Sequence, residues 1–137
     1  MGWLILRVDA DNPIGMGHLM RCLALAQCWK KTGGQAVFLS HNLSPILRSW
    51  VESSDFQYMP IDGRHPDPLD LTSALKAVKK LSLSDLDIEH SWFILDGYHF
   101  DSDYQRKLKE SGLRRLVIDD YAHLSHYHAE VVLNQNL

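Results

Sequence analysis

The sequence predicts an α/β domain in the form of a Rossmann-like parallel sheet with helices on both faces. Nearly continuous apolar runs, typical of strands buried on both faces, alternate with segments whose apolar residues recur at helical spacing. The 137 residues, 45% hydrophobic and 23% charged, match one ordinary globular domain. There is no internal repeat and no boundary signal, so residues 1–137 are expected to form a single domain.

The first strand and the first helix have the clearest signals. Residues 3–8 are an almost uninterrupted apolar run and are predicted to form a strand. Turn residues follow, with glycines at 15 and 17. The next helix is indicated by apolar residues that share one face: Leu19, Cys22, Leu23, Ala26 and Trp29. Gly33 and Gly34 are expected to end it.

Two more strands and a short helix complete the first half of the chain. Residues 36–39 are predicted to form the second strand, and residues 56–61 a third, weaker one. The helix between them is expected over residues 43–51. Ser44 is its expected N-cap and Pro45 lies in its first turn.

The second half continues the alternation. Residues 62–68 have the composition of a loop. The apolar face of the following helix is expected to consist of Leu71, Leu75, Val78 and Leu81. A polar helix over 103–111, closed by Gly112, is also predicted. The remaining strands are predicted at residues 92–95, 116–118 and 131–133.

Charge and composition exclude several classes of function. The 14 Lys and Arg against 17 Asp and Glu give a net charge of −3, so no nucleic-acid partner is expected. No apolar run approaches the roughly 18 residues that a membrane helix needs, and no signal peptide precedes Arg7. A cytoplasmic protein without a membrane partner is therefore predicted. Cys22 and Cys28 lie in one helix, and we expect two free thiols.

Polar residues follow the predicted strands at the edge where open parallel sheets bind ligands. Asp9 and Asp11 follow the first strand, His41 follows the second, and Asp96 follows the strand at 92–95. Any loop between a strand and a helix is polar, so each loop alone is explained equally well by solvation. Together these residues predict where a site would lie.

The sharpest local signal is the run Gly15-Met16-Gly17-His18, which follows a strand and opens a helix. Glycines there allow the backbone to approach an anion, and the helix N-terminus offers N–H groups and a positive dipole end. The same dipole end favours the neutral imidazole of His18, which is the form that a general base needs. The alternative is that His18 only caps or packs the turn.

Two nucleotide motifs are absent. A dinucleotide fingerprint requires a third glycine where Met20 stands, and an acidic residue after the second strand, where the chain has Ser40-His41-Asn42. No Gly-Lys-Ser/Thr sequence exists, so a P-loop is excluded as well. No cofactor is expected.

Three histidines near the C-terminus raise the question of a metal. His123, His126 and His128 follow Asp119 and Asp120, and these residue types can bind a metal ion. Their spacing matches no standard structural site, and neither cysteine is near. We therefore expect a solvated loop and no metal.

One charged residue, Arg7, lies inside a predicted buried strand. A buried guanidinium needs a carboxylate partner or a ligand anion. Asp9 and Asp96 are both candidates, and the sequence does not choose between them.

Three blocks of residues resemble the nucleotide-sugar hydrolases of pseudaminic acid biosynthesis, which are also described as spore-coat polysaccharide biosynthesis proteins. The first block is RVDAD at 7–11 with IGMGHLMR at 14–21, and the second is ILDGY at 94–98. The third is VIDD at 117–120 with AEVVLNQN at 129–136. The blocks stand in the order of that family and extend over the whole chain.

The resemblance implies the N-terminal domain of a two-domain GT-B fold. The family's C-terminal nucleotide-binding domain, which supplies most contacts to UDP, has no counterpart in these 137 residues. The implied reaction is the metal-independent hydrolysis of UDP-2,4-diacetamido-2,4,6-trideoxy-β-L-altropyranose by attack of water at the anomeric carbon. The expected partners are this UDP-sugar and the C-terminal domain. The face that would meet that domain is a candidate for self-association.

The resemblance also implies roles for individual residues. His18 corresponds to the base that activates water, and Tyr98 to a tyrosine that lines the same pocket, so both are catalytic candidates. The candidate substrate-binding residues are Asp11, Gly15, Met16, Gly17, Arg21 and Asp96. Two alternatives stay open: a GT-B glycosyltransferase domain that transfers the sugar to an acceptor, and a binding domain without catalysis.

Overall fold

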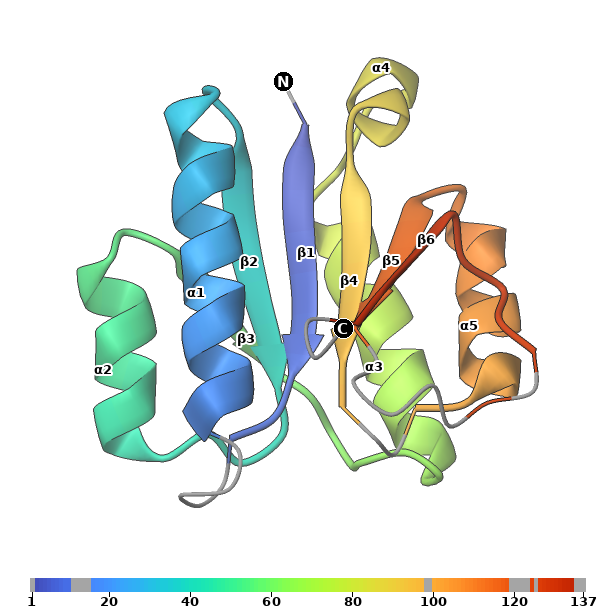
Figure 1. Cartoon of the computed structure of the whole chain (residues 1–137), viewed down its shortest axis with the longest axis horizontal. Coiled ribbons are helices and arrows are strands. Elements are labelled where there is room, and N and C mark those ends of the chain that lie inside the picture. Colours follow the sequence, from blue (N-terminus) through green and yellow to red (C-terminus); the bar gives the residue numbers. More distant parts are fainter. Residues whose placement is uncertain (1, 11–15, 98–99, 119–123, 125, 135–137) are drawn as a thin grey trace.

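The computed structural model describes residues 2–10, 16–97, 100–118, 124 and 126–134. Its centre is a six-stranded sheet in the order β3-β2-β1-β4-β5-β6, and all five strand pairs are parallel (Figure 1). The strands are β1 (Trp3–Val8), β2 (Gln35–Ser40), β3 (Gln57–Pro60), β4 (Trp92–Asp96), β5 (Arg114–Ile118) and β6 (Val131–Leu133). The α/β, Rossmann-like class is confirmed.

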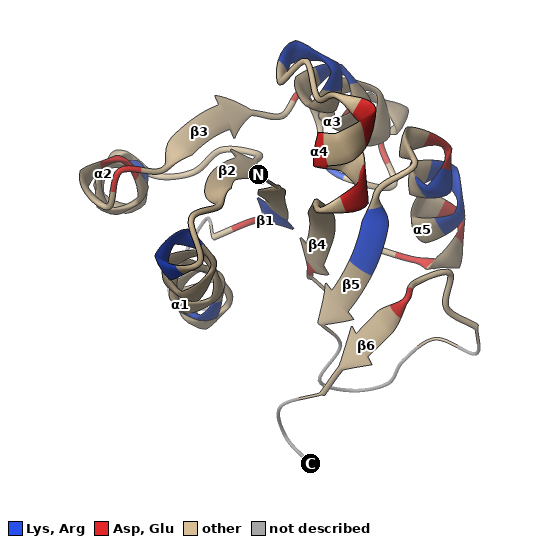
Figure 2. Cartoon of the chain, turned by 90° about the horizontal axis from the view of Figure 1, so that it is seen from above, with Lys and Arg blue, Asp and Glu red and all other residues tan. Residues whose placement is uncertain are grey.

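Helices cover both faces of this sheet, as Figure 2 shows. On one face lie α1 (Met16–Lys31) and α2 (Pro45–Ser53), and on the other α3 (Pro68–Lys80), α4 (Asp85–Glu89) and α5 (Ser102–Leu108). Crossovers between parallel strands are right-handed, so the face that a helix covers depends on the direction in which the chain crosses the sheet. That direction reverses between β3 and β4. The reversal places a topological switch point between β1 and β4, where open sheets bind ligands.

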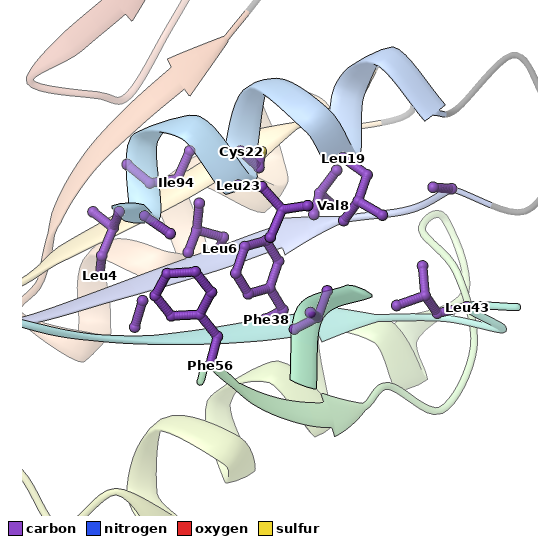
Figure 3. Packing of buried hydrophobic residues seen from close by; sticks show 14 of the residues in the cluster. Leu4, Leu6, Val8, Leu19, Cys22, Leu23, Phe38, Leu43, Phe56 and Ile94 are labelled. Atoms are coloured by element: carbon purple, nitrogen blue, oxygen red, sulfur yellow. The ribbon is translucent and has the colours of Figure 1, made fainter. Parts of the chain in front are cut away.

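Two hydrophobic layers enclose the sheet. Successive residues of β1 contribute to opposite layers, because side chains alternate along a strand. Leu6 belongs to the layer under α1 and α2, with Leu19 and Phe38 (Figure 3), whereas Ile5 belongs to the layer under α3 and α5, with Phe93. Burial on both faces explains why the strands have continuous apolar runs.

The predicted caps of two helices agree with the structure, although α2 extends over Pro45–Ser53 and not over 43–51. The Ser44 hydroxyl caps α2 by accepting a hydrogen bond from the Leu47 N–H, and Pro45 is the first helical residue. Gly112 ends the 3₁₀ turn Lys109–Ser111, which follows α5, with a left-handed φ of 77°. Helix α4 is not predicted, because five residues are too few for a periodic apolar pattern. A capping box at Ser84 begins it.

The four apolar residues predicted for the buried face of helix α3 do pack against the second layer, although they are only partly buried. The fully buried residues of the helix are Asp70, Ala74 and Ala77, which lie one position before three of the predicted ones. Two alanines allow the helix to lie close to the sheet, and Asp70 reaches the guanidinium of Arg7. A buried ion pair therefore contributes to the orientation of this helix.

No helix among the described residues is long and apolar enough to span a membrane.

Candidate functional site

Three polar side chains meet at the switch point, where β4 ends beside the first turns of α1. Asp96 is the last residue of β4, and its neighbour across the sheet is Val8 at the end of β1. His18 and Arg21 are three residues apart on α1 and therefore share one helix face. Both reach the carboxylate of Asp96. The structure thus brings together three of the residues that the sequence marks as candidates.

The contacts around Asp96 are short. His18 Nδ1 lies 2.6 Å from Asp96 Oδ1, and Arg21 Nη2 lies 2.5 Å from the same oxygen. Arg21 Nε donates to Asp96 Oδ2 over 2.6 Å, and the Cys22 thiol donates to it over 3.5 Å. The Asp96 side chain is 0% exposed, whereas those of His18 and Arg21 are each 14% exposed. A buried carboxylate thus holds an imidazole that reaches solvent.

The contact between His18 and Asp96 assigns the tautomer of the imidazole. An ionised carboxylate only accepts hydrogen bonds, so Nδ1 must carry the proton that it shares with Asp96. The 2.9 Å between Arg21 Nη2 and His18 Nδ1 is then the separation of two donors that share one acceptor oxygen. With the proton on Nδ1, the lone pair of the neutral ring lies on Nε2. This is the arrangement in which a histidine acts as a general base.

Electrostatics keep Asp96 ionised. Burial favours its neutral form, but the hydrogen bonds from Arg21 and His18 outweigh burial, so the pKa of the Asp96 carboxyl lies below its ordinary value. The neighbouring thiol has the opposite shift. Burial, together with the charge of Asp96, raises the pKa of Cys22 well above its ordinary value. At neutral pH, Cys22 is therefore a thiol donor and not a nucleophile.

Thiol labelling is expected to separate the two cysteines. Cys28 is exposed on α1, whereas Cys22 is fully buried and protonated, so we expect one thiol to react quickly and the other only after unfolding. Counting reactive thiols with a chromogenic disulfide reagent, in buffer and in denaturant, measures this. In Cys28→Ser the fast reaction should disappear. Two fast thiols in the native protein would contradict the packing of Cys22 against Asp96.

The remaining candidate residues divide into two groups. Met16 and Gly17 are exposed in the first turn of α1, and a Cβ built on Gly17 would meet nothing within 4 Å. At Gly17, the start of this helix is therefore open as far as the described residues show. Asp11, Gly15 and Tyr98 lie outside the described residues. The expectation that His18 and Tyr98 share one cleft stays a prediction.

Arg7 belongs to a separate buried network. Its Nη1 is 2.6 Å from Asp9 Oδ1, and its Nε and Nη2 donate to the two oxygens of Asp70 over 3.0 and 2.8 Å. The Tyr104 hydroxyl and the His65 N–H also donate to Asp70, each over 2.7 Å. Of the two partners considered from the sequence, Asp9 is confirmed, whereas Asp96 is paired with His18 and Arg21. Asp70 was not predicted as a partner, although the sequence has one signal for it: a carboxylate among the apolar residues of α3.

Opposite effects act on the charges of this network. Burial favours the neutral forms of both partners. For Asp70, the hydrogen bond and charge of Arg7, together with hydrogen bonds from the His65 N–H and the Tyr104 hydroxyl, outweigh burial, so the pKa of its carboxyl lies below its ordinary value. For Arg7, hydrogen bonds and attraction to Asp70 and Asp9 outweigh burial and raise the pKa of the guanidinium. Burial and the charge of Asp70 raise the pKa of the Tyr104 hydroxyl as well. Arg7 and Asp70 are thus charged at neutral pH and fully buried, while Asp9 lies 3.5 Å from the half-exposed Arg64.

Of the five residues considered for a metal, Asp119, Asp120 and His123 lie outside the described residues, so the expectation of no metal stays a prediction. The rings of His126 and His128 are in contact, with centroids 4.5 Å apart. Within the ranges that the structure describes, no three His, Cys, Asp or Glu side chains gather in a way that could hold a metal ion.

An apolar surface adjoins the site on the α1 side of β4, β5 and β6. Two shallow pockets there share Leu25 and Cys28. Their other lining residues are Leu4, Arg21, Ala24, Trp29, Thr32, Trp92, Ile94, Leu116, Ile118 and Leu133. Parallel sheets are usually covered on both faces. Self-association, which was expected for the face that would meet a second domain, stays a prediction.

Comparisons with known proteins address the fold. No protein-family model matches the sequence, and no curated protein matches it. The structure is similar to MurG from Acinetobacter baumannii, with a TM-score of 0.65 at 14% identity over 96% of this chain and 40% of that chain. It is also similar to a UGT transferase from Siraitia grosvenorii in complex with UDP, with a TM-score of 0.54 at 19% identity over 87% of this chain and 28% of that one.

Both similar structures have the GT-B fold, so the chain has the Rossmann-like architecture of one domain of that fold, as the sequence predicts. The chain spans well under half the length of either structure. Neither of the two is a member of the hydrolase family that the sequence blocks resemble. At these identities the similarity establishes the fold.

Proposed function

We propose that this domain supplies the general base of a GT-B enzyme that cleaves a nucleotide sugar at its anomeric carbon. The observation that carries the proposal is the pairing of His18 with buried, ionised Asp96 at the switch point of the sheet. The oxygen of an attacking hydroxyl group bonds to the anomeric carbon, and His18 Nε2 accepts the proton of that hydroxyl group. The bond between that carbon and the diphosphate breaks, and the nucleoside diphosphate leaves with its electron pair.

UDP is the leaving group that we propose. One of the similar structures holds UDP and is described as a transferase. A UDP-sugar also suits the chemistry, because the exposed start of α1 offers backbone N–H groups and a positive dipole end to a diphosphate. Because these groups stabilise negative charge, we propose that the reaction needs no metal ion. A second GT-B domain would supply the remaining contacts to the nucleotide.

The attacking group separates two candidate functions. Similarity to a transferase structure favours the hydroxyl group of an acceptor, and the protein would then be a glycosyltransferase. The three residue blocks at 7–21, 94–98 and 117–136 favour water, and the protein would then hydrolyse a UDP-diacetamido-trideoxy sugar of the pseudaminic acid type. His18 performs the same proton transfer in either case. In both cases a single displacement inverts the anomeric carbon.

Proton NMR of the reaction products tests the function. UDP-2,4-diacetamido-2,4,6-trideoxy-β-L-altropyranose and a panel of common UDP-sugars are mixed with the 137-residue chain, and with any longer product of the same gene. EDTA is present in one arm, and small hydroxyl acceptors are present in another. Release of UDP with a free sugar of inverted configuration supports the hydrolase, and a new glycoside supports the transferase. Because a second domain would supply part of the nucleotide contacts, the 137-residue chain alone is expected to be much less active; intact substrates with the longer product as well would leave only binding, and the proposal would fail.

Replacing Gly17 by alanine tests whether substrate approaches the start of α1. A Cβ there meets no atom of the described residues within 4 Å, and alanine favours a helix over glycine by about 1 kcal/mol, so stability should stay unchanged or rise. The methyl group would stand between the backbone and a diphosphate, so KM for the UDP-sugar is expected to rise severalfold. Gln27→Ala, on the exposed face of the same helix, is the matched control. An unchanged KM in Gly17→Ala would place the substrate elsewhere.

A further inference from the structure

We infer that Arg21 is a positioning residue for His18. By hydrogen bonding to both oxygens of Asp96, Arg21 keeps His18 in the reactive tautomer. This differs from the role expected for Arg21 from the sequence, which is direct binding of substrate. The inference rests on the proposed function only for its kinetic consequence. The tautomer of His18 is a property of the chain itself and can be measured without substrate.

The first observation that supports this role is the geometry of the Arg21 guanidinium. Arg21 places Nε on Asp96 Oδ2 and Nη2 on Asp96 Oδ1, at 2.6 and 2.5 Å. Such a fork binds both oxygens of a carboxylate in one plane and prevents the carboxylate from rotating. Oδ1 therefore stays directed at His18 Nδ1, which lies 2.6 Å away. The orientation of the imidazole thus depends on that of the guanidinium.

The second observation is the negative charge of the buried Asp96. A carboxylate with a fully buried side chain requires a cation to stay ionised, and Arg21 is the cation in contact with it. Without Arg21, Asp96 would take up a proton and donate it to Nδ1, which moves the lone pair of the ring from Nε2 to Nδ1. The other titratable group on Asp96, the Cys22 thiol, is neutral and does not replace the cation.

The same contacts argue against a direct role in substrate binding. Two of the three guanidinium nitrogens of Arg21 are directed at Asp96 within the protein. The Arg21 side chain is only 14% exposed, which is the same fraction as for His18. An arginine that binds phosphate would instead present its fork to the ligand.

Nitrogen NMR of the chain with ¹⁵N-labelled histidine is the test. In the wild type at neutral pH, His18 is expected to show a pyrrole-type Nδ1 and a pyridine-type Nε2. In Arg21→Gln the pyridine-type Nε2 signal is expected to be lost or to move to Nδ1. Arg21→Lys keeps a cation but not the fork, so it should retain part of the wild-type signal. It also keeps the proposal testable should Arg21→Gln fold poorly.

Arg48→Gln is the matched control, because Arg48 forms an exposed i,i+4 pair with Glu52 on α2. This variant should leave the His18 signals unchanged. If Arg21→Gln is folded and keeps the wild-type tautomer of His18, the positioning role is wrong. The same conclusion follows if Arg21→Lys is folded and behaves no differently from the wild type.

Kinetics provide the second readout once a UDP-sugar substrate is identified. A positioning residue acts on the proton transfer, so Arg21→Gln is expected to lower kcat by about 10- to 100-fold with little change in KM. A raised KM with unchanged kcat would instead assign Arg21 to substrate binding. If no UDP-sugar reacts with the wild type, the proposed function fails, and the NMR result still decides whether Arg21 holds the tautomer.

Discussion

Replacing Asp70 by asparagine is expected to lower the free energy of unfolding by about 3–5 kcal/mol. The side chains of Asp70 and Arg7 are both 0% exposed, and asparagine has nearly the same shape as aspartate. The substitution therefore removes the charge with little change in packing. Arg7 would keep only Asp9 as a charged partner in direct contact. Hydrogen bonds from Tyr104 and the His65 N–H would also lose their anionic acceptor.

Urea unfolding followed by circular dichroism measures this change. Asp103→Asn is the matched control, because Asp103 forms exposed pairs with Arg106 and Lys107 on α5. Exposed pairs contribute about 0–1 kcal/mol, so this variant should remain close to the wild type. A loss below about 1 kcal/mol in Asp70→Asn would mean that the network stabilises the fold far less than buried ion pairs do.

The same network has an expected pH dependence. The pKa of Asp70 is lower in the folded chain than its ordinary value of 3.8, so ionisation of Asp70 stabilises the fold at neutral pH. This contribution is fully present above the ordinary value, and it is lost as pH falls through the folded pKa. Asp70→Asn should therefore lose less stability than the wild type on acidification below about pH 4.

Replacing His18 by glutamine is expected to lower kcat for cleavage of the UDP-sugar by about 10²- to 10⁴-fold, which is the usual contribution of a general base. A glutamine side chain can still donate a hydrogen bond to Asp96, but it cannot take the proton of an attacking hydroxyl group. Asp96 remains paired with Arg21, so the fold should be retained. The rate of UDP release and the unfolding curve are measured on the same preparation.

His90→Gln is the control for this substitution. His90 is an exposed residue that follows α4, so its replacement should leave kcat unchanged. If His18→Gln retained the wild-type kcat, His18 would only pack the first turn of α1. The base would then have to be another residue, and the pairing with Asp96 would be structural.

Prediction from the sequence succeeded where the signal is local. The buried strand β1, the apolar face of α1 and the Ser44 cap of α2 all follow from residues within a few positions of one another. The strand β5 shows the limit of this approach. It begins at Arg114, before its predicted start, because Arg115 is buried in the strand and pairs with Glu130. Because the partner of Arg115 is distant in the sequence, local patterns assign this charged residue to a loop.

The alternation of strands and helices, the α/β class and the place of His18 in the first turns of α1 are properties of the sequence by itself. Their physical basis is the period of side chains along a strand or a helix, which neighbouring residues determine. Only the tertiary structure decided that His18 meets Asp96, 78 residues away, and that Arg7 meets Asp70, 63 residues away. These partners depend on the strand order, which places β1 between β2 and β4, and on the packing of α3 against the sheet. The whole chain determines that packing, so no local pattern contains it.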